Sequence, residues 1–418
     1  PRVKEGTENS EKPEYETVME NTTLNSMVPI WQKPKKDVTD EEYNSFYKEK
    51  FFDFEDPIAT IHASVEGAVT YKALLYIPAK APYDFYTKDF KKGLQLYSSG
   101  VMIMENCADL LPDCFRFVRG VVDSQDLSLN ISREMLQHDR QLKFIAGNLE
   151  KKIKAELQKL LDNDREKYEK FFAAFGPQIK YGVLADYGAK KEALQDLLLY
   201  WSSKEGKLIS LKEYAAAMPE DQKYIYYANG ESRERLGQLP QMEKLQQKGY
   251  DVLFMTDEVD GFVPQTLGKY QEKELKSITA GDLGLETEEE KKAAEEKSEK
   301  SKQTLDFVKK TLGDKVKDVR LSDNLGSHPV SVVPAEGMTF EMEKYFKRVD
   351  PNSGMKADRI LEFNADHPIF AKLQIAVAQD EKKAEDLVKI LYTQALLMAD
   401  LPVENAGEYT DLVCSLIG

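Results

Sequence analysis

The stretch FRFVRGVVDSQDLSLNISREMLQ, residues 115–137, decides the expected fold, because it reads as a buried strand, a polar turn and the start of a helix. Ser132 is a good helix N-cap and would place Arg133 in the first helical turn. The free backbone N–H groups and the helix dipole disfavour a cation there unless an anion is close. Arg133 therefore needs an anionic partner, which could be a nearby carboxylate (Glu134, Asp126 or Asp123) or the phosphate or carboxylate of a ligand.

Strand patterns precede this stretch, and a long amphipathic helix continues from Arg133. Apolar residues alternate at period two over 58–65 and 69–77, on either side of the Glu66-Gly67 turn, and further strands are expected near 94–97 and 101–104. The helix carries an apolar stripe at steps of three and four residues: Leu142, Ile145, Leu149, Ile153, Leu157 and Leu160. We expect a mixed sheet with this helix packed on it.

A second α/β unit is visible from residue 223 to residue 257. The strand KYIYY (223–227) leads through Asn229-Gly230 into a helix over 231–247, and DVLFMTD (251–257) returns as a strand, which is a βαβ pattern. The turn ANGES (228–232) contains one glycine and lacks the Lys-Ser or Lys-Thr ending of a phosphate-binding loop. Further helices are expected over 168–175 and 190–200.

Residues 285–303 are dense in charge and predict a solvated helix that marks a domain boundary. Beyond it the sequence predicts strands over 315–322, 331–335 and 359–364, an amphipathic segment MTFEMEKYFK (338–347) and two terminal helices. A chain of 418 residues exceeds the usual size of one core, so more than one domain is expected.

Composition excludes several classes of function. The 41% hydrophobic and 31% charged residues, without a long apolar run, indicate a soluble globular protein with no membrane partner. The net charge of −15 disfavours nucleic acid as a partner, because phosphate binding needs clustered Lys and Arg. Cys107, Cys114 and Cys414 form no disulfide framework, which favours a reducing compartment. The four histidines show no ligand spacing, so no metal site and no common hydrolase motif is expected.

The two terminal helices have apolar stripes that need a partner. The first stripe includes Leu387, Val388, Leu391, Ala395 and Met398, and the second includes Leu412, Val413, Leu416 and Ile417. The stripes could pack on the sheet of their own domain, or they could form a helical dimer interface.

Three groups of aromatic and Met residues are candidate contact surfaces. Met338, Met342, Tyr345 and Phe346 lie in the amphipathic segment, and flexible Met beside aromatic rings suits adaptable binding, although core packing would also explain them. Tyr83, Phe85 and Tyr86 lie in a Pro-containing loop. Trp31 stands where ordered structure is expected to begin and could be an anchor or a lid on the core.

Six segments together resemble the heat-shock protein 90 (Hsp90) chaperones: IWQKPKKDVTDEEYNSFYK, FEDPIATIHASVEG, LLYIPAKAPYDFY, FVRGVVDSQDLSLNISREMLQ, MPEDQKYIYYANGES and DVLFMTDEVD. The resemblance runs from about residue 29 to the C-terminus and is most specific before residue 285. It implies a bacterial, cytoplasmic member of the family, since the chain ends in CSLIG without the MEEVD-like or KDEL tails. It also implies middle and C-terminal domains without the N-terminal ATP-binding domain.

The resemblance implies a multidomain α/β and α+β fold. A mixed-sheet αβα middle domain with a smaller βαβ subdomain would precede a small α+β dimerisation domain that ends in two helices. The expected parts are a linker or tail (1–28), a large middle subdomain (29–162), connecting helices (163–188), a small middle subdomain (189–284), a charged connector (285–303) and the dimerisation domain (304–418).

The resemblance also implies functional roles. Arg133 would reach the ATP γ-phosphate, with Asn130 and Gln137 in the same catalytic segment, and a planar guanidinium suits that charge. ATP and Mg would be bound by the missing domain, so no cofactor is expected in this chain and no ATPase activity from it alone. Trp31, the Tyr83–Tyr86 loop and the Met338–Phe346 segment would contact partly folded client proteins, and the terminal helices would form a homodimer. The alternative functions are a structural interaction module, or the middle region of a gyrase or mismatch-repair ATPase.

Overall fold

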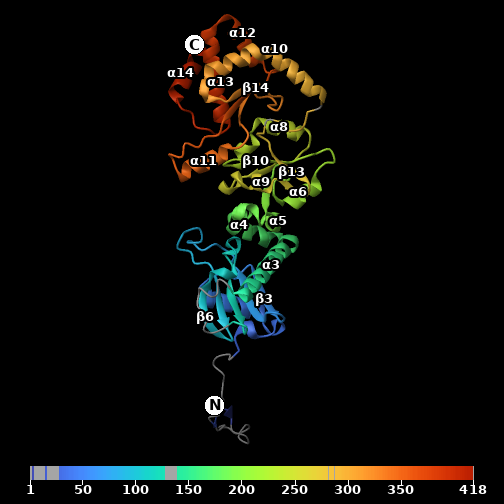
Figure 1. Ribbon diagram of the computed structural model, residues 1–418, viewed down its shortest axis with the longest axis vertical. Helices are drawn as coiled ribbons and strands as arrows, with labels where there is room; N and C mark the ends of the chain where they lie inside the picture. Colours follow the sequence, from blue (N-terminus) through green and yellow to red (C-terminus); the bar gives the residue numbers. More distant parts are fainter. Residues whose placement is uncertain are drawn as a thin grey trace, which may run out of the picture. The chain divides into compact units, whose positions relative to one another are not determined.

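The computed structural model describes residues 2–3, 15–16, 28–127, 139–280, 282–286 and 288–417. The chain divides into two compact units: residues 1–79, 84–111 and 118–150 form unit 1, and residues 80–83, 112–117 and 151–418 form unit 2. The helices and mixed sheets of each unit (Figure 1) confirm the predicted α/β and α+β fold class. In the described part of the chain, no helix has the length and apolar character needed to cross a membrane.

Unit 1 is built on a five-stranded mixed sheet with the order β3-β4-β7-β5-β6. The strands are β3 (Ala59–Val65), β4 (Tyr71–Ile77), β5 (Leu94–Ser98), β6 (Val101–Cys107) and β7 (Arg119–Ser124). Only β5 and β7 are parallel neighbours in this sheet. The predicted strand pairs are confirmed, but the strand expected from Phe115 begins at Arg119, because Asp113–Phe115 form the 3-10 turn η4.

Short N-terminal elements complete unit 1. β1 (Arg2–Val3) pairs with β2 (Tyr15–Glu16), and η1 (Ile30–Gln32) and η2 (Lys35–Asp37) lead to α1 (Asp40–Phe51). Thr39 and Glu42 form a capping box at the start of α1, in which each side chain accepts the other residue's backbone N–H. The helix buries Tyr43 and Tyr47 in a cluster with Trp31 and Tyr76, so α1 is fixed on the sheet by aromatic packing.

Helix α3 (Arg140–Asn163) carries the predicted apolar stripe, and the side chains of Leu142, Ile145, Leu149, Ile153 and Leu157 are at most 1% exposed. The predicted continuous helix from Arg133 is interrupted at Asp139, and its first part, residues 133–138, lies outside the described residues. Asp139 lies outside the helix and caps it, because its Oδ1 accepts the N–H groups of Gln141 at 2.7 Å and Leu142 at 3.0 Å.

Unit 2 contains a six-stranded sheet with the order β12-β13-β10-β11-β8-β9. Its strands are β8 (Leu199–Ser202), β9 (Leu208–Ser210), β10 (Ile225–Asn229), β11 (Leu253–Met255), β12 (Lys269–Tyr270) and β13 (Lys273–Ser277). Its helices are α4 (Arg165–Gly188), α5 (Lys191–Leu194), α6 (Leu211–Ala217), α7 (Arg233–Gly237), α8 (Pro240–Gln247) and α9 (Val263–Leu267), with the 3-10 turns η5 (Gln195–Leu197) and η6 (Glu258–Gly261).

β10 and β11 are parallel, which confirms the βαβ pattern, but two helix predictions in this region need correction. The crossover is divided into α7 and α8, because Pro240 lacks an N–H group and opens a new helix. The helix expected over 190–200 gives way after η5 to β8, which pairs antiparallel with β11. The long-range pairing of β8 overrides the local helical pattern.

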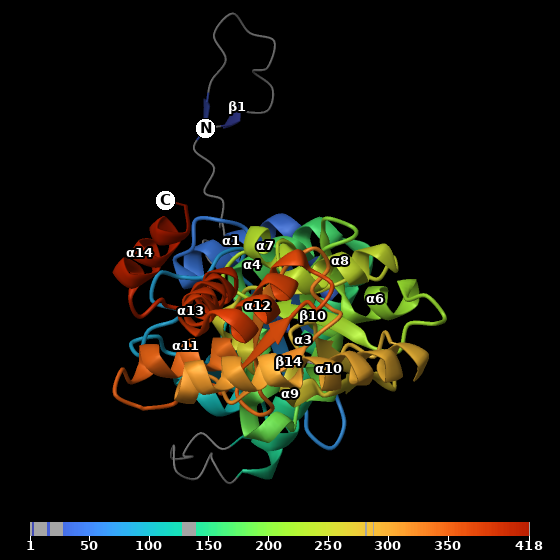
Figure 2. The same cartoon turned by 90° about the horizontal axis from the view of Figure 1, so that it is seen from above.

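The C-terminal part of unit 2 has a three-stranded sheet, β14 (Asp318–Leu321), β16 (Arg359–Phe363) and β15 (Val330–Pro334) in that order. Its helices are α10 (Glu288–Leu312), α11 (Phe340–Val349), α12 (Pro368–Gln379), α13 (Glu381–Met398) and α14 (Ala406–Ile417), with the 3-10 turn η7 (Gly313–Lys315). Helices α10, α12 and α13 lie against one another (Figure 2). The charged segment forms most of α10, as predicted, whereas α12 was not predicted.

Candidate functional site

An aromatic cluster joins α11 to the turn η6 in unit 2. The ring of Phe262, next to η6, lies 5.2 Å from the ring of Tyr345 and 5.9 Å from that of Phe346, measured between centroids. Both contacts are close to perpendicular, at 81° and 85°, which is a favourable edge-to-face geometry. All three side chains stay partly exposed, so they form a continuous aromatic surface, which we call the aromatic platform.

The sequence of α11 explains which side chains reach this platform. Thr339 caps the helix by accepting the N–H of Met342 at 3.2 Å. Phe340 and Met342 are buried, and Met338 packs against the core of the C-terminal part. Of the four predicted contact residues on this segment, Tyr345 and Phe346 therefore lie on the platform, whereas Met342 is buried and Met338 packs on the C-terminal core.

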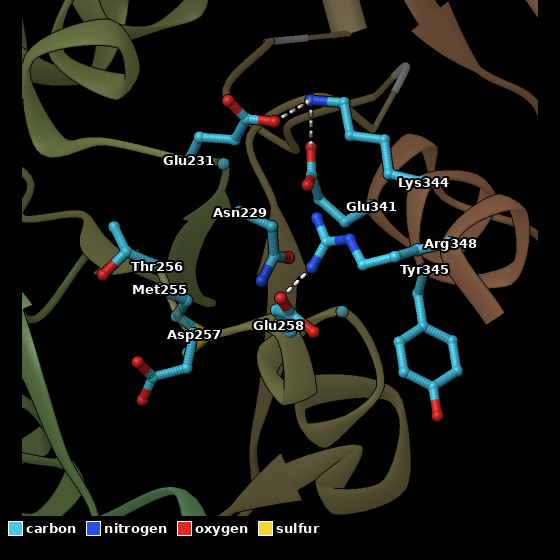
Figure 3. Close-up of a pocket in the computed structure, with 12 residues that line it drawn as sticks. Asn229, Glu231, Met255, Thr256, Asp257, Glu258, Glu341, Lys344, Tyr345 and Arg348 are labelled. Carbon is cyan, nitrogen blue, oxygen red and sulfur yellow. Dashed lines mark hydrogen bonds and ion pairs between the residues drawn. The ribbon is translucent and has the colours of Figure 1, made fainter.

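Ion pairs lie near Tyr345 of the platform (Figure 3). Lys344 Nζ lies 3.8 Å from Glu231, 3.3 Å from Glu341 and 3.4 Å from Asp400, so it joins α11 to the turn after β10 and to the chain after α13. Arg348 pairs with Glu258 of η6. Through Glu231 and Glu258 these contacts attach α11 to the small α/β part of unit 2.

The turn η6 is itself fixed by a buried charge cluster. Lys180 of α4 donates to the carboxylates of Asp257 and Asp260, at 2.7 Å in each case, and is only 3% exposed. Asp260 is fully buried, and burial raises the pKa of its carboxyl group although Lys180 opposes that rise. Paired buried charges of this kind hold a turn rigidly, because breaking the pair strands a charge in the interior.

The cavity beside the platform is too small for a substrate. It has a volume of about 50 Å³ and lies among Asn229, Glu231, Asp257, Glu341 and Arg348 (Figure 3). That volume holds little more than a water molecule. Within the described ranges, no cluster of His, Cys, Asp and Glu could hold a metal ion.

The family model described as "Hsp90 protein" matches residues 2–418 of the chain. The chain belongs to the Hsp90 family. It is 52% identical over 416 residues to the chaperone protein HtpG of Bacillus subtilis, 51% identical over 417 residues to that of Oceanobacillus iheyensis, and 52% identical over 404 residues to that of Clostridium acetobutylicum. These alignments cover 97–100% of this chain but only 64–66% of each relative. The proposed resemblance to Hsp90 is thereby confirmed.

Phe262 is the platform residue of this Hsp90 chain that the sequence reasoning missed. It follows DVLFMTDEVD, which carried the resemblance, but a single Phe after a turn has no periodic pattern of its own. Its partners Tyr345 and Phe346 lie far away along the chain, so only the folded structure brings them together.

Trp31 lies in the core of unit 1. It is 7% exposed, and its Nε1 donates to Asp123 at 3.1 Å. Asp123 also accepts from Gln32 Nε2 at 2.9 Å and from the Gly100 N–H at 3.1 Å. Trp31 thus fits the alternative of a lid on the core, since little of its ring can reach another protein.

The Tyr83–Tyr86 loop presents its rings unequally. Tyr83 is fully exposed and Tyr86 is 55% exposed. Phe85 is buried, and its ring lies 4.9 Å from that of Phe90 in an edge-on contact. The two tyrosines remain available for contact, and Phe85 anchors the loop.

Asn130, Arg133 and Gln137 lie outside the described residues, so their proposed catalytic role stays a prediction. Asp123 and Asp126, two of the three acids considered as local partners for Arg133, already accept hydrogen bonds in unit 1. Asp123 accepts the three hydrogen bonds described above, and Asp126 Oδ2 accepts the Thr70 N–H at 2.6 Å.

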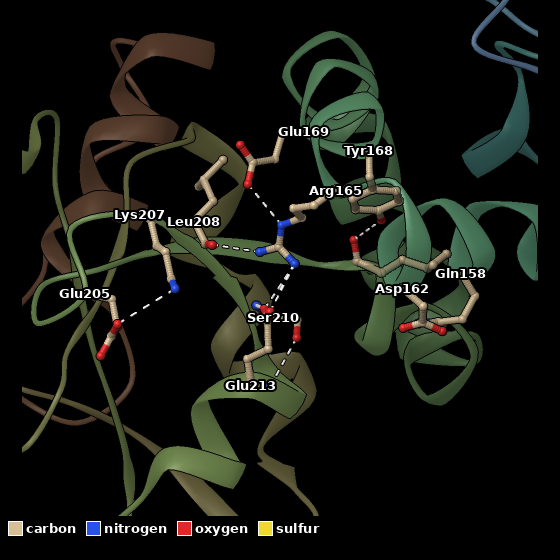
Figure 4. A network of polar contacts seen from close by, with 11 residues as sticks. Gln158, Asp162, Arg165, Tyr168, Glu169, Glu205, Lys207, Leu208, Ser210 and Glu213 are labelled. Atoms are coloured by element: carbon tan, nitrogen blue, oxygen red, sulfur yellow. Dashed lines mark hydrogen bonds and ion pairs between the residues drawn. The ribbon is translucent and has the colours of Figure 1, made fainter.

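Arg165 shows how this chain satisfies an arginine at a helix start (Figure 4). It follows the N-cap Asp164 and lies in the first turn of α4. Its guanidinium binds Glu169 at 3.0 Å, Glu213 at 3.1 Å and the Leu208 carbonyl oxygen at 2.7 Å. Arg165 is therefore a structural residue that ties α4 to β9 and α6, and local carboxylates replace the anionic ligand considered for Arg133.

The stripe predicted on α13 is buried within this chain. Leu387, Val388, Leu391 and Ala395 belong to the core that α13 forms with α10, α12 and the three-stranded sheet. This is the first of the two alternatives, because periodicity identifies the apolar face but not the surface that covers it. Met398, Leu412 and Val413 are partly exposed, the neighbouring Leu397 is 55% exposed, and the side chains of Leu416 and Ile417 lie outside the described set.

Proposed function

We propose that this Hsp90 chain acts as a chaperone that binds partly folded client proteins at the aromatic platform of Phe262, Tyr345 and Phe346. The observation that supports it most directly is the partial exposure of three rings held at 5.2 to 5.9 Å on two separate elements. Partly exposed aromatic rings bury apolar groups of many sequences, and the supporting Met338 and Met342 can adapt to their shape.

The relatives point in the same direction. Each of those reported above is named as a chaperone protein, and the chain aligns with them over at least 97% of its length. Tyr83 and Tyr86 provide a second exposed aromatic site, whereas the buried Trp31 and Phe85 are left out of the proposed surface. A gyrase-like or mismatch-repair transducer, or a purely structural module, is not favoured by the family match.

An aggregation assay tests the platform. Tyr345→Ser and Phe346→Ser should each weaken suppression of heat-induced aggregation of a model enzyme, so that about three to ten times more chaperone is needed, as expected from losing one aromatic contact. Tyr187→Ser is the matched control, because this exposed tyrosine lies outside the platform. Equal suppression by all three variants would contradict the proposal.

The proposal extends to ATP hydrolysis and dimerisation by the longer Hsp90 proteins. Arg133, with Asn130 and Gln137, would act on ATP and Mg held by a nucleotide-binding domain, and the guanidinium would stabilise charge on the transferred phosphoryl group. A homodimer would form through α14 and the exposed side of α13. The sequence resemblance supports the first statement, and the exposure of Leu397, Leu412 and Val413 supports the second.

A further inference from the structure

The aromatic platform exists only while α11 is held on η6, because Phe262 comes from one side of this contact and Tyr345 and Phe346 from the other. Few uncharged contacts hold α11 there. Phe262 contacts the rings of Tyr345 and Phe346, and Met342 Sδ lies 3.8 Å from Gln265 Nε2. Charged contacts join α11 to η6 and to the segments beside it.

The charged contacts fall into two groups. The first group is centred on Lys344, whose side chain is only 20% exposed: it pairs with Glu341 within α11, with Glu231 in the turn after β10 and with Asp400 after α13, so Glu231 is its partner in the small α/β part. Asp400 also pairs with Arg235 of α7. The second group is the single pair Arg348–Glu258, in which both side chains are more than half exposed.

We infer that Arg348–Glu258, together with Lys344–Glu231, forms a salt-sensitive ionic latch, which holds α11 on η6 and the neighbouring turn after β10 and thereby assembles the aromatic platform. This inference rests on the proposed function for its consequence in client binding. Exposed ion pairs are weak one by one and are screened by salt, whereas a network with a partly buried hub retains more of its attraction. The turn η6 is held in place because Lys180 forms ion pairs with Asp257 and Asp260. Phe340 and the buried Glu343–Arg359 pair attach α11 to the C-terminal core, so α11 moves with that core, and ionic strength controls how much of it is docked.

A designed disulfide can report the docked state. A Cβ placed on Gly261 would lie 3.4 Å from Glu341 Cβ, close to the range that a disulfide requires. In a Cys414→Ser background, which removes the exposed thiol of α14, Gly261→Cys with Glu341→Cys should crosslink rapidly at low salt. Glu258→Arg should slow the crosslinking about three- to tenfold, and adding Arg348→Glu should restore it.

Binding is measured on the full 418-residue chain with fluorescently labelled, reduced and carboxymethylated α-lactalbumin, which stays unfolded. Glu258→Arg should raise the Kd about three- to tenfold, as should high salt, and the closed disulfide should restore tight binding until it is reduced. Asp366→Arg is the control. It reverses one charge and breaks the exposed Lys297–Asp366 pair, which lies outside α11, so it should change neither the crosslinking rate nor the Kd.

The outcomes separate the two proposals. The latch would be overturned if neither the crosslinking rate nor the Kd changed with Glu258→Arg, with the added Arg348→Glu or with salt. A parent chain that fails to bind the unfolded probe, while crosslinking still follows the charge at position 258, would overturn the proposed function and support the latch. Circular dichroism of each variant shows that the fold is retained.

Discussion

At the scale of single residues, the buried pair Glu343–Arg359 is a contact whose loss should strongly lower stability. The two side chains are 2% and 5% exposed, and Arg359 Nη2 lies 3.1 Å from Glu343 Oε1. Glu343 also accepts from the Ala357 N–H at 2.8 Å and from Lys347 Nζ at 2.5 Å. Through these bonds one carboxylate joins α11 to the segment before β16 and supports the platform from beneath.

Glu343→Gln should lower the free energy of unfolding by about 3–5 kcal/mol at neutral pH, because Arg359 would keep a buried charge without its anion. Burial would raise the pKa of the Glu343 carboxyl, but hydrogen bonds from Lys347, Ala357 and Arg359 outweigh it and hold the pKa below the ordinary 4.5. Glu343 therefore adds stability above pH 4.5 that is lost as the pH falls through the lower folded pKa.

Denaturant unfolding of the parent chain and of Glu343→Gln across about pH 3–7 measures the difference in their free energy of unfolding. The stability difference should shrink as the pH falls below 4.5, the ordinary pKa of Glu343. Glu336→Gln, on an exposed residue before α11, serves as the control and should leave stability nearly unchanged. A Glu343→Gln variant as stable as the parent at pH 7 would show that Arg359 finds another anion.

At the scale of elements, helix α13 has a buried apolar face, which stabilises the fold, and an exposed side, for which we propose a role in assembly. Leu391 is 3% exposed in the C-terminal core, whereas Leu397 is 55% exposed. Leu391→Ala should cost about 2–5 kcal/mol of unfolding free energy by leaving a cavity. Leu397→Asp should change monomer stability by less than about 1 kcal/mol, and should shift a homodimer toward monomer by placing a charge in the interface.

Analytical ultracentrifugation over a concentration series, together with unfolding of dilute protein, distinguishes the two effects. If Leu391→Ala dissociated the dimer and left the fold intact, the interface would lie on the stripe first predicted from periodicity. If Leu397→Asp left a dimer unchanged, the exposed side of α13 would have no part in assembly.

The same elements show how far the sequence predicts this molecule. Periodicity located β3, β4, β10, α3 and α13, because each element's own residues determine which face is apolar. It failed over 190–200 and at Pro240, where a long-range strand pairing and a missing N–H override the local pattern. It also missed Phe262 and the latch, because contacts between distant segments leave no spacing to detect.

At the scale of the whole molecule, the chain aligns with 66% of the length of its Bacillus subtilis relative, and we propose to test the ATPase role of Arg133 in a longer Hsp90 protein. With a nucleotide-binding domain joined to this chain, Arg133→Ala should slow ATP hydrolysis about ten- to thousandfold, as expected from the loss of one donor to the transferring phosphoryl group. ATP affinity should change little if, as proposed, the nucleotide is held by the other domain.

Single-turnover hydrolysis and nucleotide-binding calorimetry separate these two quantities. Arg140→Ala is the matched control, since this exposed arginine begins α3 only seven residues further along the chain. Arg165 cannot serve as a control, because its loss would break the network that joins α4 to α6. An unchanged rate in Arg133→Ala would instead support a local carboxylate as its partner, as Glu169 and Glu213 are for Arg165.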